Sequence, residues 1–223
     1  MPTAKERLSH LLVLAGEGPA QRAALLGELA DLVLDWPCDC PEAMRLPVLA
    51  LLELTVREAD DETRAKLAAR LGGHGELPLS LVNEFYLSAP ARVRREILTR
   101  NQFARDDETD GDIVAADAHA LLAAARDAAI RDFAGAFGGT TGIPRDVAQT
   151  ILSDASGEPL AVLCKGAQLD RATFSALVLL KSTAGETQLS VFDTVPQHAA
   201  ERLTRHWRSH AEHEPAERAH AAE

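Results

Sequence analysis

The segment DDETRAKLAARL, residues 60–71, decides the fold class of this chain. Its acidic start offers a side chain, from Asp60 or Asp61, that can accept hydrogen bonds from the free amides of a first helical turn. Apolar residues then recur at helical spacing up to Leu71, and Gly72-Gly73 follows as a stop signal. The pattern predicts a short amphipathic helix with a defined start and end.

The same unit of a short helix and a break at Gly or Pro recurs on both sides of this segment. No segment shows the sustained two-residue alternation of a strand. The first helix is predicted from an apolar stripe that ends before Gly16: Leu8, Leu11, Leu12 and Ala15. Further helices are predicted at 19–35, 44–56 (restarted or kinked by Pro47), 78–87, 90–100, 114–137, 144–152, 159–163, 170–180 and 196–207, with a helix or extended piece at 188–192.

Short amphipathic helices cannot bury their apolar faces alone, and stacking antiparallel pairs side by side buries them. The sequence therefore predicts an all-α protein with the architecture of an α-solenoid. A four-helix bundle is the competing architecture, and it would need fewer and longer helices than the prolines allow. Two packed halves, 1–101 and 114–208, are predicted on either side of an acidic linker at 102–113. The tail, 209–223, has no apolar stripe and is predicted to be disordered.

Two segments carry a helical-repeat signature. Residues 60–71 resemble the second helix of a HEAT-type repeat, in which an acidic cap and a following Arg form a ladder between neighbouring repeats. Residues 88–98, SAPARVRREIL, resemble the next register, because Arg94 lies thirty residues after Arg64. The second copy lacks the acidic cap.

A larger part of the chain, residues 7–101 and 147–180, resembles a bacterial family of uncharacterised, all-helical, HEAT-like repeat proteins. The resemblance implies a HEAT-like fold of short antiparallel helix pairs and an interaction-type role. It supplies no active-site residues.

Composition narrows the function classes. The net charge of −11, from 23 Lys and Arg against 34 Asp and Glu, disfavours a general binder of nucleic acid or anionic membranes. Aromatic residues make up 4% of the chain, so few rings can stack on bases. The most apolar stretch, Leu46 to Val56, is too short to span a bilayer and contains Glu53. Three cysteines, Cys38, Cys40 and Cys164, without a leader sequence indicate reduced thiols, so we expect a cytoplasmic protein.

An acidic segment, residues 106–117, holds six carboxylates and no basic residue. Asp106, Glu108, Asp110 and Asp117 fall at positions 1, 3, 5 and 12 of a calcium-binding loop, with a glycine at the turn position. Glu at position 3 and Asp at position 12 depart from the usual ligands. The alternative is a solvated linker whose carboxylates lie near the positive end of the following helix.

A basic strip precedes this segment and consists of five arginines: Arg92, Arg94, Arg95, Arg100 and Arg105. These side chains could bind an acidic partner or a phosphate backbone, as in HEAT-like DNA-repair glycosylases. Such enzymes also need a catalytic carboxylate and aromatic side chains along a basic groove. The alternative is that the arginines pair with the acidic segment or between repeats.

No motif of nucleophilic or phosphate chemistry is present: there is no Gly-x-Ser-x-Gly, no Walker loop and no Gly-x-Gly-x-x-Gly after a strand. His206, His210 and His213 share a helical face, but they lie at the predicted fraying end. We therefore expect a non-enzymatic module or scaffold that binds another protein and needs no cofactor. The alternative is a HEAT-like nucleic-acid-binding or DNA-repair protein that uses the strip from Arg92 to Arg105.

Overall fold

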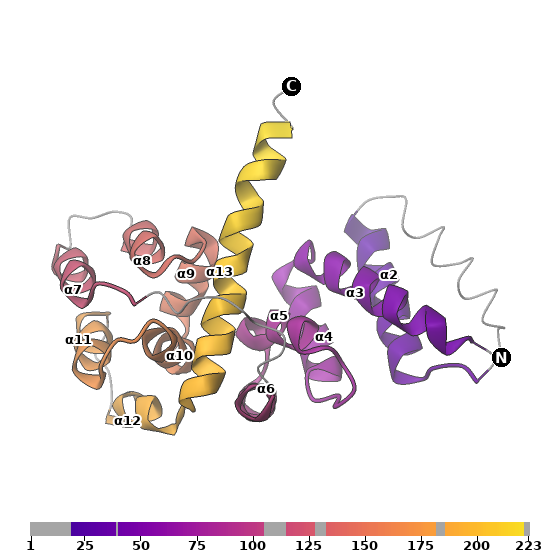
Figure 1. The fold of residues 1–223 in the computed structure, drawn as a ribbon, viewed down its shortest axis with the longest axis horizontal. Helices are drawn as coiled ribbons and strands as arrows, with labels where there is room; N and C mark the ends of the chain where they lie inside the picture. Colours follow the sequence, from indigo (N-terminus) through magenta and orange to yellow (C-terminus); the bar gives the residue numbers. More distant parts are fainter. Residues whose placement is uncertain (1–18, 39, 105–114, 128–132, 182–185, 221–223) are drawn as a thin grey trace. The chain divides into compact units, whose positions relative to one another are not determined.

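The computed structural model describes residues 19–38, 40–104, 115–127, 133–181 and 186–220 (Figure 1). Within these ranges the elements are α-helices and short 3-10 helices, with no strand, so the all-α prediction is confirmed. The elements are α2 (Pro19–Leu34), η1 (Glu42–Met44), α3 (Arg45–Arg57), α4 (Asp61–Leu71), α5 (Leu79–Glu84), η2 (Tyr86–Ser88), α6 (Ala91–Phe103), α7 (Ala118–Arg126), α8 (Phe133–Thr141), α9 (Arg145–Ser153), α10 (Glu158–Gly166), α11 (Arg171–Lys181), α12 (Glu186–Thr194) and α13 (Gln197–His220).

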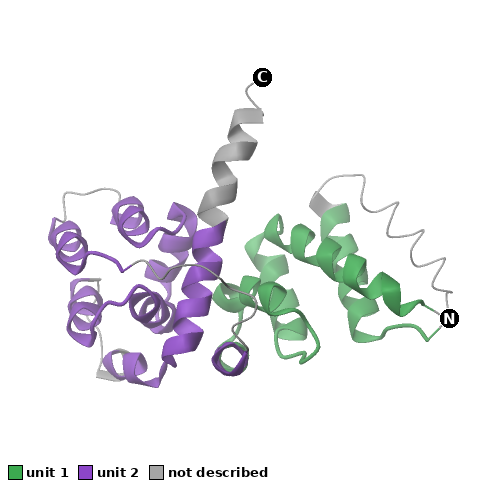
Figure 2. Cartoon of the chain, viewed as in Figure 1, with its two compact units in different colours: residues 1–97 green, residues 98–223 purple. Residues whose placement is uncertain are grey.

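The chain divides into two compact units, residues 1–97 and 98–223 (Figure 2). The division falls inside α6, a few residues before the predicted linker at 102–113. Most of that linker, residues 105–113, lies outside the described residues.

The first unit is held together by contacts between consecutive helices and between helices separated by one helix in the chain. α2 packs on both α3 and α4, and α3 packs on α5. The core between them is largely aliphatic, and its fully buried large side chains include Leu26, Leu29, Leu52, Leu71, Leu81, Phe85 and Tyr86. An aliphatic core of short helices agrees with the low aromatic content.

The predicted helix starts use carboxylate and proline caps. Asp60, rather than Asp61, caps α4: its Oδ1 accepts the Thr63 amide at 2.8 Å and its Oδ2 accepts the Thr63 hydroxyl at 3.0 Å. Asp170 accepts the Thr173 amide in the same way, at 2.8 Å. Pro47 lies in the first turn of α3, where an amide has no helical acceptor, so it stands near the start of the helix.

Arg64 and Arg94, thirty residues apart, make equivalent contacts. The Arg64 guanidinium donates to the carbonyls of Arg57 and Ala59, at 3.3 and 2.9 Å, just after α3. Arg94 donates to the carbonyls of Tyr86 and Leu87, at 3.1 and 3.0 Å, in η2, which follows α5. Each arginine thus satisfies the free carbonyls at the end of the preceding helix.

Arg64 therefore donates to backbone carbonyls, whereas the repeat resemblance predicts a ladder with the acidic cap of a neighbouring repeat. The carboxylate nearest to its guanidinium is Asp61 of its own helix, at 3.9 Å. The regular spacing reflects a repeated helix-end contact, which arginine makes because its planar donors can reach two carbonyls at once.

In the second unit α10 contacts four other helices: α9, α11, α12 and α13. Its residues Leu160–Cys164 are all buried. α13 crosses it closely at Gly166, where a side chain would collide with Thr204 and with the Ala200 carbonyl. The packing of α10 on α13 is the most extensive helix–helix contact of this unit among the described residues.

The structure corrects three predicted boundaries in this unit. The single helix expected at 114–137 is two helices, α7 and α8, and residues 128–132 between them lie outside the described part. α8 continues through Gly138-Gly139, where a stop was predicted, and ends before Gly142, whose φ is +75°. α13 continues to His220, beyond the predicted end of the helix at 207.

Candidate functional site

The predicted basic strip is split by the geometry of α6. Arg92 is exposed and pairs with Glu96 one turn further on, Nη1 to Oε1 3.4 Å. Arg94 is buried, donates to the carbonyls that follow α5, and lies over the Tyr86 ring with its Cζ 5.7 Å from the centroid. Arg94 therefore belongs to the core of the first unit.

The remaining arginines of the strip differ among themselves. Arg95 is exposed, and Arg100 is half-buried, which lowers the pKa of its guanidinium through loss of solvent. Arg105 lies outside the described residues. Arg92 and Arg95, three residues apart, are the two exposed members that share a helical face.

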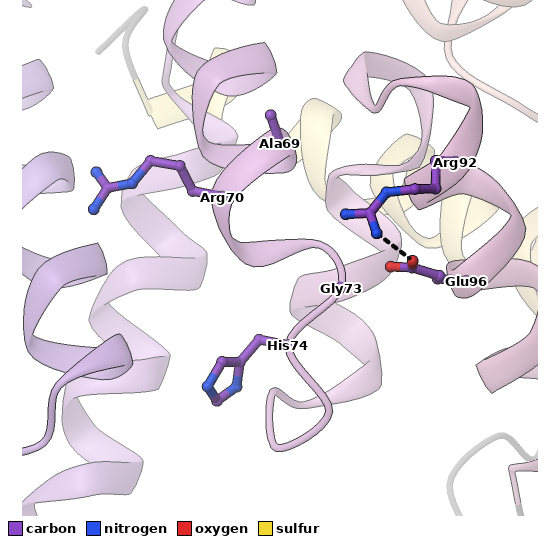
Figure 3. A pocket seen from close by; sticks show the side chains of 6 residues that line it. All are labelled: Ala69, Arg70, Gly73, His74, Arg92 and Glu96. Carbon is purple, nitrogen blue, oxygen red and sulfur yellow. Dashed lines mark ion pairs between the residues drawn. The ribbon is translucent and has the colours of Figure 1, made fainter.

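A small open pocket of about 340 Å³ lies next to Arg92, between the end of α4 and α6 (Figure 3). Its lining consists of Ala69, Arg70, Gly73, His74, Arg92 and Glu96. Arg70 points away from Arg92 and forms an ion pair with Asp31, while Arg92 pairs with Glu96. Each guanidinium thus already has a carboxylate, and no Ser, Thr or Cys lines the pocket. It offers neither a nucleophile nor an unneutralised anion site.

Asp117, the last predicted ligand of the calcium-like loop, caps α7. Its Oδ1 accepts the amides of His119 and Ala120, at 2.9 and 3.1 Å. The other predicted ligands, Asp106, Glu108 and Asp110, lie outside the described residues. The contacts of Asp117 are those of a carboxylate at the positive end of a helix.

The cysteines are unpaired thiols: Cys38 is exposed, and Cys40 and Cys164 are buried. Burial raises the pKa of the Cys164 thiol far above its usual range, so this thiol is inert. Among the described residues, no three His, Cys, Asp or Glu side chains gather where they could hold a metal ion. No described helix combines the length and the apolar character needed to cross a bilayer.

The most distinctive surface feature is an apolar stripe on α3, which the sequence analysis does not anticipate. It consists of Leu46, Pro47, Ala50, Leu51 and Leu54, hereafter the α3 stripe, all of them exposed. Leu46 is 74% exposed and Leu54 62%, values that single out two leucines eight residues apart on one helix. Such a concentration of exposed leucine on one helix is typical of a binding surface.

The α3 stripe exists because α3 is apolar on more than one face. One face of α3 packs into the core through Val48, Leu49, Leu52 and Val56. The remaining apolar residues of α3 lie on the other faces of the helix, which the core does not cover. Leu51 within α3 and Met44 immediately before it are both exposed. The sequence signal is available, since seven of the ten residues from Leu46 to Thr55 are Leu, Val or Ala.

Elsewhere in the part of the chain that the structure describes, exposed large apolar residues form no comparable stripe. Phe103 ends α6, and Leu179 and Leu180 are adjacent near the end of α11. Adjacent residues of a helix point about 100° apart, so these two leucines do not form one continuous ridge.

Comparison with known families adds one finding. Residues 42–218 match the model of a family described as an uncharacterised protein conserved in bacteria, DUF2336. The chain belongs to this family. The match begins in η1, just before the α3 stripe, and extends through both compact units into α13. No curated protein and no solved structure matches the sequence significantly.

Proposed function

We propose that this protein is a non-enzymatic, HEAT-like helical-repeat module that binds another protein. The observation that carries the proposal is the α3 stripe, whose leucines have no apolar neighbour among the described residues that covers them. The repeated helix-end contacts of Arg64 and Arg94 support the repeat character, as does the packing of α2 on α4 and of α3 on α5.

The size of the stripe sets the strength of the interaction. Fully burying one leucine side chain stabilises by about 2 kcal/mol. Covering the exposed parts of Leu46, Leu51 and Leu54, which are 74%, 39% and 62% exposed, therefore contributes about 3–4 kcal/mol. Since association itself costs at least about 4 kcal/mol, the partner must add further contacts around the stripe.

The shape of the stripe indicates the kind of partner. Leu46, Ala50 and Leu54 are spaced four residues apart and form a ridge along one helix. A ridge of this kind is complementary to the apolar face of another amphipathic helix, which presents residues at spacings of three and four. We therefore expect the partner to offer an amphipathic helix.

The test compares two matched double variants in affinity capture from the native cytosol. Leu46→Glu with Leu54→Glu places two charges on the stripe, and Leu179→Glu with Leu180→Glu places two on exposed leucines of the other unit. Wild type and the second variant should recover the same partner, and the first should lose it. A partner recovered equally by all three proteins, or only by the α3 variant, would refute the proposal.

Nucleic-acid binding is the competing function, and Arg92 and Arg95 are the exposed members of the strip among the described residues. An electrophoretic shift at low salt that is lost in Arg92→Glu with Arg95→Glu would favour it. The split of the strip and the net charge of −11 make the protein partner the better-supported proposal.

A further inference from the structure

We propose that the partner of the α3 stripe is a second copy of this chain, bound through an antiparallel contact of the two α3 helices about a twofold axis beside Ala50. The inference rests on the proposed function, because it names the protein that covers the stripe. Three features of α3 support it: the symmetric order of its exposed residues, the pairing of the charges beside them, and the size of the exposed surface.

The exposed ridge of α3 is symmetric about its central residue. Leu46, Ala50 and Leu54 follow one another at spacings of four and share one face of the helix. In a twofold contact the same surface meets itself, so a residue four positions before the axis lies across from the residue four positions after it. With the axis beside Ala50, Leu46 of one copy meets Leu54 of the other, and Ala50 meets its own counterpart. Every facing position of the ridge is therefore apolar.

A second apolar row supplies the groove that such a contact needs. Pro47 and Leu51 lie beside the ridge, are also four residues apart, and are both exposed. Helices whose rows of four-residue spacing interdigitate cross at about −50°, which is the commonest class of helix packing in globular proteins. The ridge of each copy then lies in the groove of the other. Ala50 is at the crossing point, where a small side chain allows the helix axes to approach to about 8–10 Å.

The charged side chains beside the α3 stripe have partners within their own copy. These ion pairs join Arg45 to Glu42 and Glu76, Arg57 to Glu53 and Glu84, and Glu58 to Arg22. The stripe itself contains no charged residue. A second helix on the stripe therefore buries an apolar centre, leaves the ion pairs as a polar rim, and removes no unpaired charge from water.

A symmetric contact also compensates for the small size of the stripe. The exposed parts of Leu46, Leu51 and Leu54 in one copy contribute, when covered, no more than the minimum cost of association. In a twofold contact these leucines count twice, once from each copy, and the doubled contribution exceeds this minimum. Pro47 and Ala50 add further apolar contact. We therefore expect a weak dimer with a Kd below about 1 mM.

Sedimentation velocity of the purified full-length chain tests self-association. Salt at about 0.15 M limits the repulsion between two copies of net charge −11 to about 8 Å. The sedimentation coefficient of the wild type should rise towards that of a dimer as the concentration approaches about 1 mM. Leu46→Glu with Leu54→Glu should weaken the dimer at least about a hundredfold, because it replaces the leucines that meet across the axis with like charges.

The matched control is Leu179→Glu with Leu180→Glu, which places the same charges on exposed leucines of the other unit. It should dimerise like the wild type. Circular dichroism should show the same helical content in both double variants, because all four leucines are exposed.

Cysteine trapping tests the orientation of the two helices. In a Cys38→Ser background the two remaining native cysteines are buried, so a cysteine introduced on α3 provides the accessible thiol. Ala50→Cys should form a disulfide-linked dimer on mild oxidation, because position 50 lies beside the axis. Leu46→Cys and Leu54→Cys should each fail to link to their own counterparts, about 12 Å away along the helix, but should link to each other when mixed.

Two results would overturn the inference. One is a wild type that sediments as a monomer up to about 1 mM and whose Ala50→Cys variant does not cross-link. The other is a dimer that Leu46→Glu with Leu54→Glu leaves intact, or one in which Leu46→Cys links to itself as readily as Ala50→Cys does.

Affinity capture distinguishes a failure of this inference from a failure of the proposed function. If both hold, a tagged chain should recover its untagged copy from the native cytosol through the α3 stripe. A monomeric chain that recovers a different protein, and loses it in Leu46→Glu with Leu54→Glu, would overturn the self-contact alone. Neither a dimer nor a captured protein would overturn both.

Discussion

Gly166→Ala should destabilise the second unit, because α10 and α13 approach each other closely at Gly166. A Cβ at this position would lie 2.5 Å from the Ala200 carbonyl oxygen and 2.6 Å from Thr204 Cβ, and nearer still to the Thr204 hydroxyl. Both α13 residues are fully buried. One of the obstructing atoms belongs to the backbone, so the two helices must move apart to make room.

The size of the effect follows from two opposing contributions. Forcing a methyl group into a packed interior costs about 1–3 kcal/mol, and three simultaneous collisions place this site at the upper end. Alanine recovers about 0.5–1 kcal/mol of helix propensity relative to glycine. The net loss is therefore about 2 kcal/mol, equivalent to a fall in Tm of about 4–8 °C for a unit of this size.

Thermal unfolding followed by circular dichroism measures this change, with Gly139→Ala as the matched control. Gly139 lies in α8 of the same unit and is exposed, and a methyl group added there would meet no atom within 4 Å, so alanine should raise stability slightly. Equal stability of Gly166→Ala and wild type would refute the close crossing. A similar loss in Gly139→Ala would show that any lost glycine, rather than this contact, is responsible.

Two further predictions concern the first and second units separately. Arg94→Ala should destabilise by about 2–4 kcal/mol in urea unfolding, because it leaves the buried carbonyl of Tyr86 and the partly buried carbonyl of Leu87 without their charged donor. Arg92→Ala should change stability by less than about 0.5 kcal/mol. The Thr173 hydroxyl and amide lower the pKa of Asp170 below its ordinary value of 3.8, so the stability that this carboxylate adds is present above about pH 4 and is lost as the pH falls through the lowered pKa. Asp170→Asn keeps a capping side chain but does not titrate, so urea unfolding between pH 5 and 2 should show a smaller loss of stability than in wild type, and an unchanged acid dependence would contradict this assignment.

The sequence predicts features that depend on a few neighbouring residues. Asp60 and Asp170 are recognisable as caps, and both accept the amide three residues later. Proline also marks helix starts correctly, as at Pro78 and Pro144, each of which immediately precedes a helix. These signals are local because the free amides of a first turn need partners within one turn of chain.

The role of a glycine cannot be predicted from its neighbours in the sequence alone. The sequence pattern predicts that Gly138 ends a helix, yet α8 continues through it. A Cβ on Gly138 would lie 2.8 Å from the Ile143 carbonyl oxygen, so this glycine allows a close approach of the chain that leads into α9. Gly166 has the corresponding role against α13. The sequence does not distinguish a glycine that ends a helix from a glycine that allows another segment to approach closely. Only the tertiary contacts distinguish the two roles.

Arginine shows the same limit for the candidate site. Arg64, Arg94, Arg202 and Arg208 all donate to backbone carbonyls near helix ends, Arg202 to Ala104 at 3.1 Å and Arg208 to Thr141 at 2.8 Å. Charge counting along the sequence treats Arg94 as part of an external strip. Its neighbour Arg95 lies about 100° further around the helix, so helical geometry alone could have separated the two.

The α3 stripe could be anticipated only in part, because α3 presents apolar residues around most of its circumference. In an amphipathic helix the sequence pattern predicts which face is buried. In a helix that is apolar on most faces, the packing of the neighbouring helices determines which face is buried. Here α2 and α5 cover the faces that carry Leu52 and Glu53, and Leu54 remains exposed. The stripe is therefore a property of how α2 and α5 pack on α3, and the sequence of α3 alone does not determine it.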